Sequence, residues 1–268
     1  MQRHVNHGTG VEWVSVLGHS TVVNATNRAG EVVGVFRSGH RVHAFRQDTD
    51  RVQHVLEIPG AMDTFAQRIT DDGTVAGDYT DTRGRHHGFV HDGVRTRPVD
   101  HPGAAHTWVT GINRHGQLAG CWQDRDGEMH GFVLDGTEFR PVNSAYVLDI
   151  DDDGTVVAVG RPRGGQPPLL IGQPNHLHLA PEPTWQPAAR QWSALAGDRL
   201  HLAGHYRAGV SSHAMAFDGS RRQCIDLRFA GSRRSSATGV CADGSVVGYV
   251  EDQDGRRRGF VLPERLAS

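Results

Sequence analysis

The chain has 268 residues, of which 37% are hydrophobic and 22% charged, and its formal net charge is -2. This balance argues against a general electrostatic attraction to nucleic acid or to an anionic membrane, and no apolar run reaches the roughly 18 residues of a membrane span. The sequence contains no lysine, which excludes a Schiff-base lysine and the GK[ST] phosphate-binding loop.

The first residues lack the apolar core of a signal peptide. Cys121, Cys224 and Cys241 are an odd number of cysteines and have no metal-like spacing. We therefore expect a cytoplasmic protein that binds no cofactor, no nucleic acid and no membrane.

Short segments rich in Val, Ile and Phe alternate along the chain with turns that contain Gly and Asp. Residues 11–17 form the first predicted strand. From residue 20 onward four predicted strands recur in each copy of a repeat; in the second copy they cover residues 64–70, 74–80, 86–92 and 94–100. The residues that close the first turn of each copy are Gly30, Gly73, Gly116, Gly154, Leu200 and Gly244, at intervals of 43, 43, 38, 46 and 44 residues.

A period near 43 residues with four strands per copy is typical of a β-propeller blade. Six copies predict an all-β, six-bladed β-propeller that occupies residues 1–268 as a single domain. The last copy ends at its third strand, "RRGFVLP", whereas residues 11–17 have no other partner. We expect residues 11–17 to pair with the strand around residues 259–262 and so to close the ring, because an open ring would leave sheet edges exposed.

The repeat resembles the HAF-type repeats, named for a His-Ala-Phe signature. "HAF" itself stands at residues 43–45 and "HGF" at residues 87–89 and 130–132, although "PPLLIG" replaces this run in the fourth copy. The resemblance covers most of the chain and implies a β-propeller but no particular reaction.

Residues that recur in most copies are expected to serve the fold. We interpret His43, His87, His130 and His213 as packing or hydrogen-bonding residues between blades, because a single site does not need several copies related by the repeat. The recurring glycines are expected to let neighbouring strands approach closely; they are Gly34, Gly77, Gly120, Gly204 and Gly248.

Residues that change between copies are the candidates for function. By analogy with other propellers, ligands should bind at the face where first strands begin and second strands end, which we call the mouth. The third residue of the first strand is aromatic in four copies, and the first residue varies among Ser, Asp, His and Arg. Such a combination of aromatic and polar groups is typical of a small-molecule site, although each ring could instead pack between blades.

The candidates for proton transfer are His106, Asp63 and His205. His106 is the first choice for the base, with Asp63 orienting it or raising its pKa; alternatively, His106 only caps the turn before it. The candidates for substrate binding are Phe65, Trp108, Tyr146, Trp192, Arg190, Arg234, Asp78, Cys121, Arg161, Tyr249 and Trp185. Trp185 lies in a proline-rich connection that forms either a lid over the mouth or an ordinary surface loop.

Asp149, Asp151 and Asp153 match the start of a calcium loop, but Gly160 stands where such a loop needs its glutamate, so we expect no metal. The sequence favours an enzyme that acts on a partly apolar small molecule without a cofactor, as a cyclase, isomerase, lyase or hydrolase. A non-catalytic ligand- or carbohydrate-binding module and a protein-interaction scaffold are the alternatives.

Overall fold

The described part of the chain is built from β-strands alone. The computed structural model describes residues 10–160, 167–180, 190–196 (backbone only), 201–219, 223–241 and 244–263. No helix capable of crossing a membrane occurs in these ranges.

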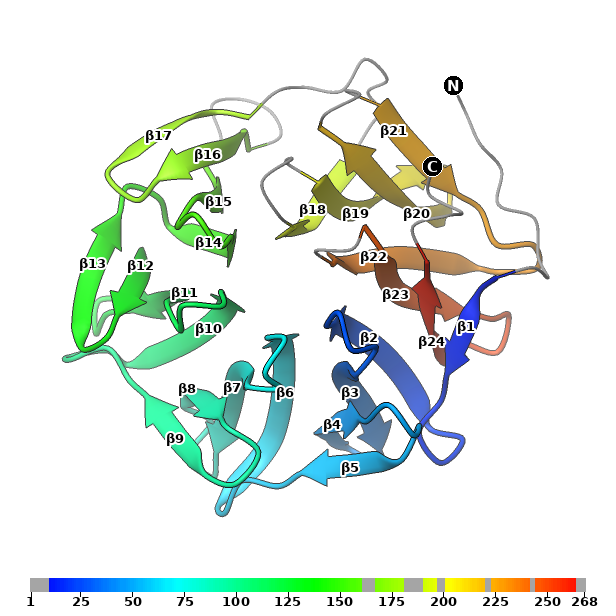
Figure 1. The fold of residues 1–268 in the computed structure, drawn as a ribbon, viewed down its shortest axis with the longest axis horizontal. Helices are drawn as coiled ribbons and strands as arrows, with labels where there is room; N and C mark the ends of the chain where they lie inside the picture. Colours follow the sequence, from blue (N-terminus) through cyan, green and yellow to red (C-terminus); the bar gives the residue numbers. More distant parts are fainter. Residues whose placement is uncertain are drawn as a thin grey trace.

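Four antiparallel sheets of four strands each follow one another along the chain (Figure 1). Their strands are β2 (Ser20–Thr26), β3 (Val32–Ser38), β4 (Arg41–Gln47) and β5 (Gln53–Leu56); β6 (Ala61–Ile69), β7 (Val75–Asp81), β8 (His86–His91) and β9 (Thr96–Val99); β10 (His106–Ile112), β11 (Leu118–Gln123), β12 (Met129–Asp135) and β13 (Glu138–Val142); β14 (Tyr146–Ile150), β15 (Val156–Val159), β16 (Leu169–Gln173) and β17 (His176–Leu179).

The remaining strands form two further groups, which a single parallel pairing of Ser212 with Arg234 connects. The first group contains β18 (Arg190–Ala196), β19 (His201–Ala208), β20 (Ser211–Asp218) and β21 (Gln223–Leu227). The second contains β22 (Arg234–Val240), β23 (Val246–Glu251), β24 (Arg257–Leu262) and β1 (Glu12–Val14). The predicted pairing of the N-terminal strand is confirmed, since Glu12, Trp13 and Val14 lie opposite Val261, Phe260 and Gly259.

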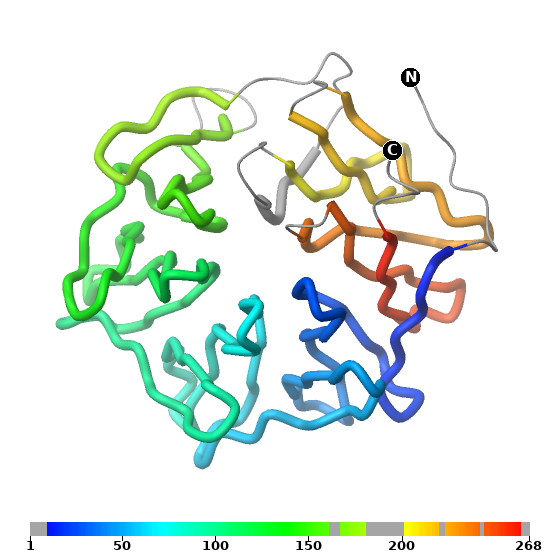
Figure 2. The backbone as a smooth tube through the Cα atoms, in the orientation of Figure 1, coloured from blue at the N-terminus to red at the C-terminus, as the bar shows by residue number. Residues whose placement is uncertain are grey.

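The sheets are arranged around a common centre, as in a β-propeller. The first strand of each group (β2, β6, β10, β14, β18 and β22) lies nearest the centre, and the last strand lies at the periphery (Figures 1 and 2). Consecutive strands within each group are antiparallel neighbours, so all the turns between first and second strands lie at one end of the sheets.

Two sets of glycines explain why the repeat folds in this way. Gly73 and Gly116 adopt positive φ angles of 83° and 76° in the turns after the first strands, a conformation that other residues rarely adopt. Gly77 and Gly120 lie against the preceding strand, where an added Cβ would come within 1.9 Å of the Phe65 carbonyl oxygen or 2.1 Å of the Trp108 carbonyl oxygen. The prediction that the second set permits close approach of backbones is confirmed.

The recurring histidine and phenylalanine have structural roles. The phenylalanines of the repeat, Phe45, Phe89, Phe132 and Phe260, are at most 1% exposed. The histidine two positions earlier stacks on the aromatic ring at the end of the second strand; the ring centroids lie 5.2 Å apart for Phe36 and His43, 5.1 Å for Tyr79 and His87, and 4.4 Å for Trp122 and His130. These three histidines therefore pack as structural residues, but the predicted location between blades is wrong for these contacts, because each stacked pair lies within one sheet.

Hydrogen bonds between first strands join neighbouring sheets near the centre. The Asn24 side chain donates to the Ala66 carbonyl at 2.7 Å, and the Thr110 hydroxyl donates to the Val147 carbonyl at 2.9 Å. The Thr238 hydroxyl donates in the same way to the Val23 carbonyl, which links the last group of strands to the first.

Candidate functional site

Strand register places the predicted site residues at the same end of their respective sheets. Each first-strand candidate lies opposite the end of a second strand: Phe65 opposite Asp78, His106 opposite Gln123, Trp108 opposite Cys121, Tyr146 opposite Val159, Arg190 opposite Tyr206, Trp192 opposite Gly204, and Arg234 opposite Glu251. Their convergence on one ligand remains a prediction. Arg161 and Trp185 lie outside the described residues, and only the backbone is described for Arg190 and Trp192.

The residue at the first position of the first strand has a structural role, even though its type varies between copies. In three sheets its side chain accepts a hydrogen bond from a backbone N–H at the start of the preceding sheet's third strand. Ser20 Oγ accepts from Arg257 at 3.0 Å, Asp63 Oδ1 from Val42 at 2.7 Å, and His106 Nδ1 from His86 at 3.1 Å. Serine, aspartate and histidine are interchangeable here because each offers an acceptor. Variation at this position is therefore not by itself a sign of function.

One cluster of titratable groups nevertheless stands out, where the β6–β9 sheet meets β10. His86 Nδ1 lies 3.1 Å from Asp78 Oδ2, and Gln67 donates to the other Asp78 oxygen at 3.4 Å. The His86 ring also lies 5.0 Å from the Trp108 ring and 5.8 Å from the His106 ring, between centroids. His106 stacks on Trp108 at 5.4 Å. We call Asp78, His86, His106 and Trp108 the Asp–His cluster.

Hydrogen bonding assigns opposite tautomers to the two histidines of the cluster. The Asp78 carboxylate accepts from His86 Nδ1–H, which leaves His86 Nε2 as the ring atom with a lone pair. His106 Nδ1 accepts from a backbone N–H, so a neutral His106 carries its proton on Nε2. Within the described residues neither Nε2 atom has a hydrogen-bond partner. The pair therefore offers one proton acceptor and one proton donor.

Burial governs the electrostatics of the cluster. Asp78 is 4% exposed, and its burial raises the pKa of the carboxyl group, while the hydrogen bond from His86 opposes the rise. Burial also lowers the pKa of His106, and the positive charge that His86 can carry lowers it further. His106 is therefore neutral near pH 7. The expectation that Asp63 would orient His106 or raise its pKa is wrong, because the Asp63 carboxylate is bonded to the Val42 N–H instead.

Several other predicted site residues have contacts that do not involve the side chains of this cluster. His205 Nδ1 contacts the Ser236 hydroxyl at 3.1 Å, and burial lowers the pKa of His205. The Arg257 guanidinium lies 4.5 Å above the centre of the Tyr249 ring. Tyr146 is 50% exposed, and Arg234 is exposed at the start of β22. Cys121 is buried beside Val147, and burial raises the pKa of its thiol to about 11, which makes it a poor nucleophile at neutral pH.

The aspartates of the calcium-like motif have other partners. Asp149 forms an ion pair with Arg68, with Oδ2 2.8 Å from Nε. The Asp151 carboxylate accepts backbone hydrogen bonds from Asp153 at 3.0 Å and Thr155 at 2.8 Å, which shape the turn. Across the described ranges no group of three or more His, Cys, Asp or Glu side chains is arranged to hold a metal.

His86 is the functional candidate that sequence reasoning missed. His86 directly precedes the repeated His87 in the sequence HHGF, so it is easily taken for part of the repeat. A signal was present, because the residue before the repeated histidine is Val42, Met129 and Ser212 in other copies and becomes histidine only here. Asp78, by contrast, was already among the predicted binding residues.

Comparison with known proteins supports the fold and leaves the function open. No protein-family model matches the sequence, and no curated protein matches it. TolB from Acinetobacter baumannii has a TM-score of 0.58 at 13% identity, over 76% of this chain and 53% of its own, so the chain spans about half the length of that protein.

Two other solved structures match nearly the whole chain. Aleuria aurantia lectin in complex with α-methyl-L-fucoside has a TM-score of 0.55 at 8% identity, over 91% of this chain and 96% of its own. A catalytically inactive histidine-to-alanine variant of virginiamycin B lyase from Staphylococcus aureus, with Quinupristin, has a TM-score of 0.50 at 14% identity, over 94% and 98%. The chain is a β-propeller of four-stranded blades, a fold used both for binding and for catalysis.

Proposed function

We propose that this chain is a six-bladed propeller of the HAF-repeat type, closed by β1, that acts without a cofactor on a partly apolar small molecule as a cyclase, isomerase or lyase. The observation that carries the proposal is the Asp–His cluster, in which a buried carboxylate orients one histidine while a second histidine presents the opposite tautomer. General acid–base catalysis explains such a combination better than structural packing does. A cytoplasmic location remains part of the proposal.

In the proposed reaction His86 Nε2 removes a proton from a carbon next to a carbonyl group of the substrate. The resulting imidazolium is stabilised by Asp78, which already accepts from Nδ1–H. His106 Nε2–H donates a hydrogen bond to the carbonyl oxygen, on which negative charge develops. Trp108 provides an apolar surface for the rest of the substrate.

The fate of the carbanion equivalent determines the reaction class. If His86 returns the proton to a different carbon, the substrate is isomerised. If the electron pair expels a leaving group on the β-carbon, and His86 protonates that group as it departs, the reaction is an elimination. If the electron pair attacks a second carbonyl carbon of the same molecule, the C=O π bond breaks, His86 gives its proton to that oxygen, and a ring closes. No external oxidant or reductant is needed in any of the three.

A non-catalytic binding module is the second candidate, and the position of His106 favours it. His106 Nδ1 accepts the same type of backbone hydrogen bond as Ser20 and Asp63, so His106 has a structural reason to be present without catalysis. The tautomers of His86 and His106 do not by themselves distinguish an enzyme from a binding module, because both functions would use the same fold.

Two measurements test the proposal. Ring-nitrogen NMR of ¹⁵N-histidine-labelled protein near pH 7 should show an Nδ1–H tautomer for His86 and an Nε2–H tautomer for His106; the opposite assignment for His86 removes the base. Wild-type protein and His86→Gln are then each incubated with a library of small-molecule extracts, and the products are compared by mass spectrometry. We expect a product whose rate of formation falls about 10²–10⁴-fold in His86→Gln.

His87→Gln is the matched control, because His87 is adjacent in the same strand but stacks on Tyr79 and contacts Asp100 at 3.0 Å. It should lower the melting temperature and leave the rate of product formation within about tenfold of wild type. A product that forms equally fast in wild type and His86→Gln, or ligand binding without any product, supports the binding module instead.

A further inference from the structure

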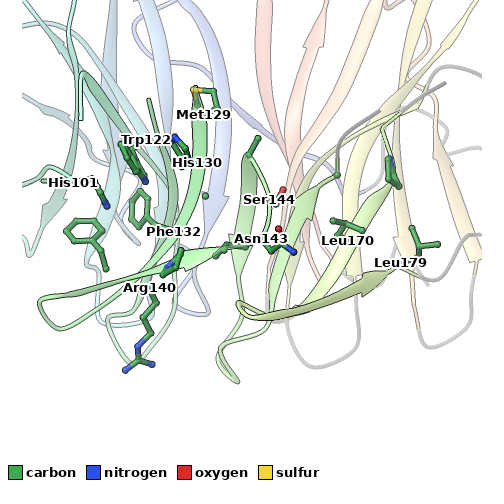
Figure 3. A pocket seen from close by; sticks show the side chains of 17 residues that line it. His101, Trp122, Met129, His130, Phe132, Arg140, Asn143, Ser144, Leu170 and Leu179 are labelled. Carbon is green, nitrogen blue, oxygen red and sulfur yellow. The ribbon is translucent and has the colours of Figure 1, made fainter. Parts of the chain in front are cut away.

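A cavity lies away from the Asp–His cluster, at the junction of the β10–β13 and β14–β17 sheets (Figure 3). Its volume is about 990 Å³. Figure 3 shows Trp122, His130 and Phe132 on one side of this space and Leu170 and Leu179 on the other, with Asn143 and Ser144 between them. We call it the junction groove.

A shortened connection explains why the groove exists. The last strand of one sheet is joined to the first strand of the next by residues 100–105 between β9 and β10, and by residues 228–233 between β21 and β22. Each of these connections inserts a ring that packs on the following sheet. His101 stacks on Trp122 with centroids 3.9 Å apart, and Phe229 packs on Phe260 at 4.9 Å.

The connection between β13 and β14 consists only of residues 143–145, Asn-Ser-Ala, and inserts no such ring. The surface on which a ring would rest is also altered. Gly160 occupies the position after β15 that corresponds to Trp122, since Val159 and Cys121 are equivalent in register. Two features of this junction therefore remove the side chains that fill the space at the β9–β10 and β21–β22 junctions, and they leave a volume at the upper end of the range for small-molecule pockets.

The chemistry of the lining indicates what could occupy the groove. Among the described residues that line it there is no carboxylate. The one guanidinium of this described lining, Arg140, is already paired with Asp135 at 3.3 Å and with Glu138 at 3.0 Å. His130 Nε2 lies 2.9 Å from an Asp124 oxygen, and burial lowers the pKa of His101 and keeps it neutral. The part of the lining that the structure describes thus provides no unpaired charge for an ionic ligand.

The other described lining residues are mostly apolar, and one of them, Asn143, has a side-chain amide that can bond a ligand. Phe139, Pro168, Leu170 and Leu179 contribute apolar walls, and Leu179 is 67% exposed. Among the described residues the side-chain amide of Asn143 has no hydrogen-bond partner, so it can donate to and accept from a ligand.

We propose that the junction groove is a second binding site, for an uncharged and largely apolar small molecule that carries a hydroxyl or carbonyl group. The apolar walls bury the carbon skeleton, and the Asn143 amide bonds the polar group. This site does not depend on the function proposed for the Asp–His cluster.

Binding of an uncharged fluorescent probe, N-phenyl-1-naphthylamine, to the full chain tests the proposal. We expect saturable binding at one site per chain. Leu179→Asp should weaken it by about tenfold or more, because it replaces an apolar wall by a charge at an already exposed position. Val210→Asp is the matched control, since Val210 is 95% exposed and does not line the groove, and it should bind as wild type does.

Further variants make the result specific. Ala145→Trp should abolish probe binding by filling the groove, with the melting temperature preserved, and His86→Gln should leave binding unchanged. The anionic probe 1-anilinonaphthalene-8-sulfonate should bind about tenfold more weakly than the neutral one, since Arg140 is already paired. Equal probe binding by wild type, Leu179→Asp and Ala145→Trp would overturn the proposal. So would a wild-type dimer that Leu179→Asp dissociates, because the occupant would then be a second copy of the chain.

Discussion

At the scale of residues, Asp78 combines deep burial with an ionisable group. A carboxylate that is 4% exposed loses most of its hydration, and one hydrogen bond from His86 and a longer one from Gln67 only partly replace it. Nearby Asp81 has the opposite environment, because backbone N–H groups of Arg85 and Arg83 stabilise its charged form and lower its pKa. The two aspartates of one strand should therefore affect stability with opposite signs.

Replacing Asp78 by Asn should stabilise the protein at neutral pH. The pKa of Asp78 in the folded state lies above the reference value of 3.8, so between these two values the native state holds a proton that the unfolded state has released. Stability conferred by Asp78 therefore falls as the pH rises through this window, and Asp78→Asn avoids the loss. Melting temperatures of wild type and variant, measured from pH 3 to 8, should diverge above the window and converge below pH 3.8.

The same titration with Asp81→Asn is the control. Since the pKa of Asp81 is lowered, its charged form stabilises the fold above pH 3.8, and the variant should melt below wild type at neutral pH. A lower melting temperature for Asp78→Asn at pH 7 would mean that its carboxylate is needed for the fold, and the case for a functional Asp–His cluster would weaken.

At the residue scale, the sequence predicts a contact along one strand better than a contact between sheets. His106 and Trp108 are two residues apart, so the sequence predicts that they share a strand face, and their rings stack in the structure. The partners of Asp63 and His106 lie in the preceding sheet and are backbone N–H groups, which leave no mark on the sequence pattern. The role of Asp63 was therefore misread.

At the scale of elements, the first position of the first strand should tolerate any small acceptor. Asp63→Ala leaves the Val42 N–H without its partner and should destabilise the protein by about 1 kcal/mol. Asp63→Ser should restore most of this loss, because Ser20 accepts the equivalent N–H of Arg257. Chemical denaturation measures both values. If Asp63→Ser is as unstable as Asp63→Ala, the Asp63 charge rather than its acceptor oxygen matters.

The strands themselves could be predicted closely because turn residues delimit them. The second copy was expected at residues 74–80 and 86–92, and the strands run from Val75 to Asp81 and from His86 to His91. The junction groove could not be predicted, because it arises from side chains that are missing. Its sequence signals are the interval of 38 residues instead of 43 and the glycine at position 160, and neither shows what space is left.

At the scale of the whole molecule, one ion pair connects sheets that are not neighbours in sequence. Arg68 lies in β6 and Asp149 in β14, and the pair passes Gly111 of β10, where an added Cβ would lie 2.6 Å from Asp149 Oδ1. Their side chains are 13% and 4% exposed. Such a contact depends on the propeller geometry and could not be predicted from the sequence.

Removing one partner of this ion pair should lower the free energy of unfolding more than removing both partners. Arg68→Met removes the Arg68 guanidinium from the buried Asp149 carboxylate and should lower the free energy of unfolding by about 3–5 kcal/mol. The double variant Arg68→Met/Asp149→Asn removes both charges and should recover a substantial part of that loss. Denaturant unfolding of the three proteins gives the coupling energy; a double variant no more stable than Arg68→Met would show that the ion pair contributes little of its own.

The N-terminal strand should be needed to protect the edge of the last sheet. Trp13 lies opposite Phe260 in the β1–β24 pairing, and Val14 and Val16 are at most 2% exposed in a core shared with Val23 of β2. Deleting residues 1–18 removes Val14 and Val16 from this core and exposes the edge of β24, which can then pair with another chain. We expect a lower melting temperature and concentration-dependent oligomers in light scattering. A protein without residues 1–18 that stays monomeric and equally heat-stable would show that β1 does not close the propeller.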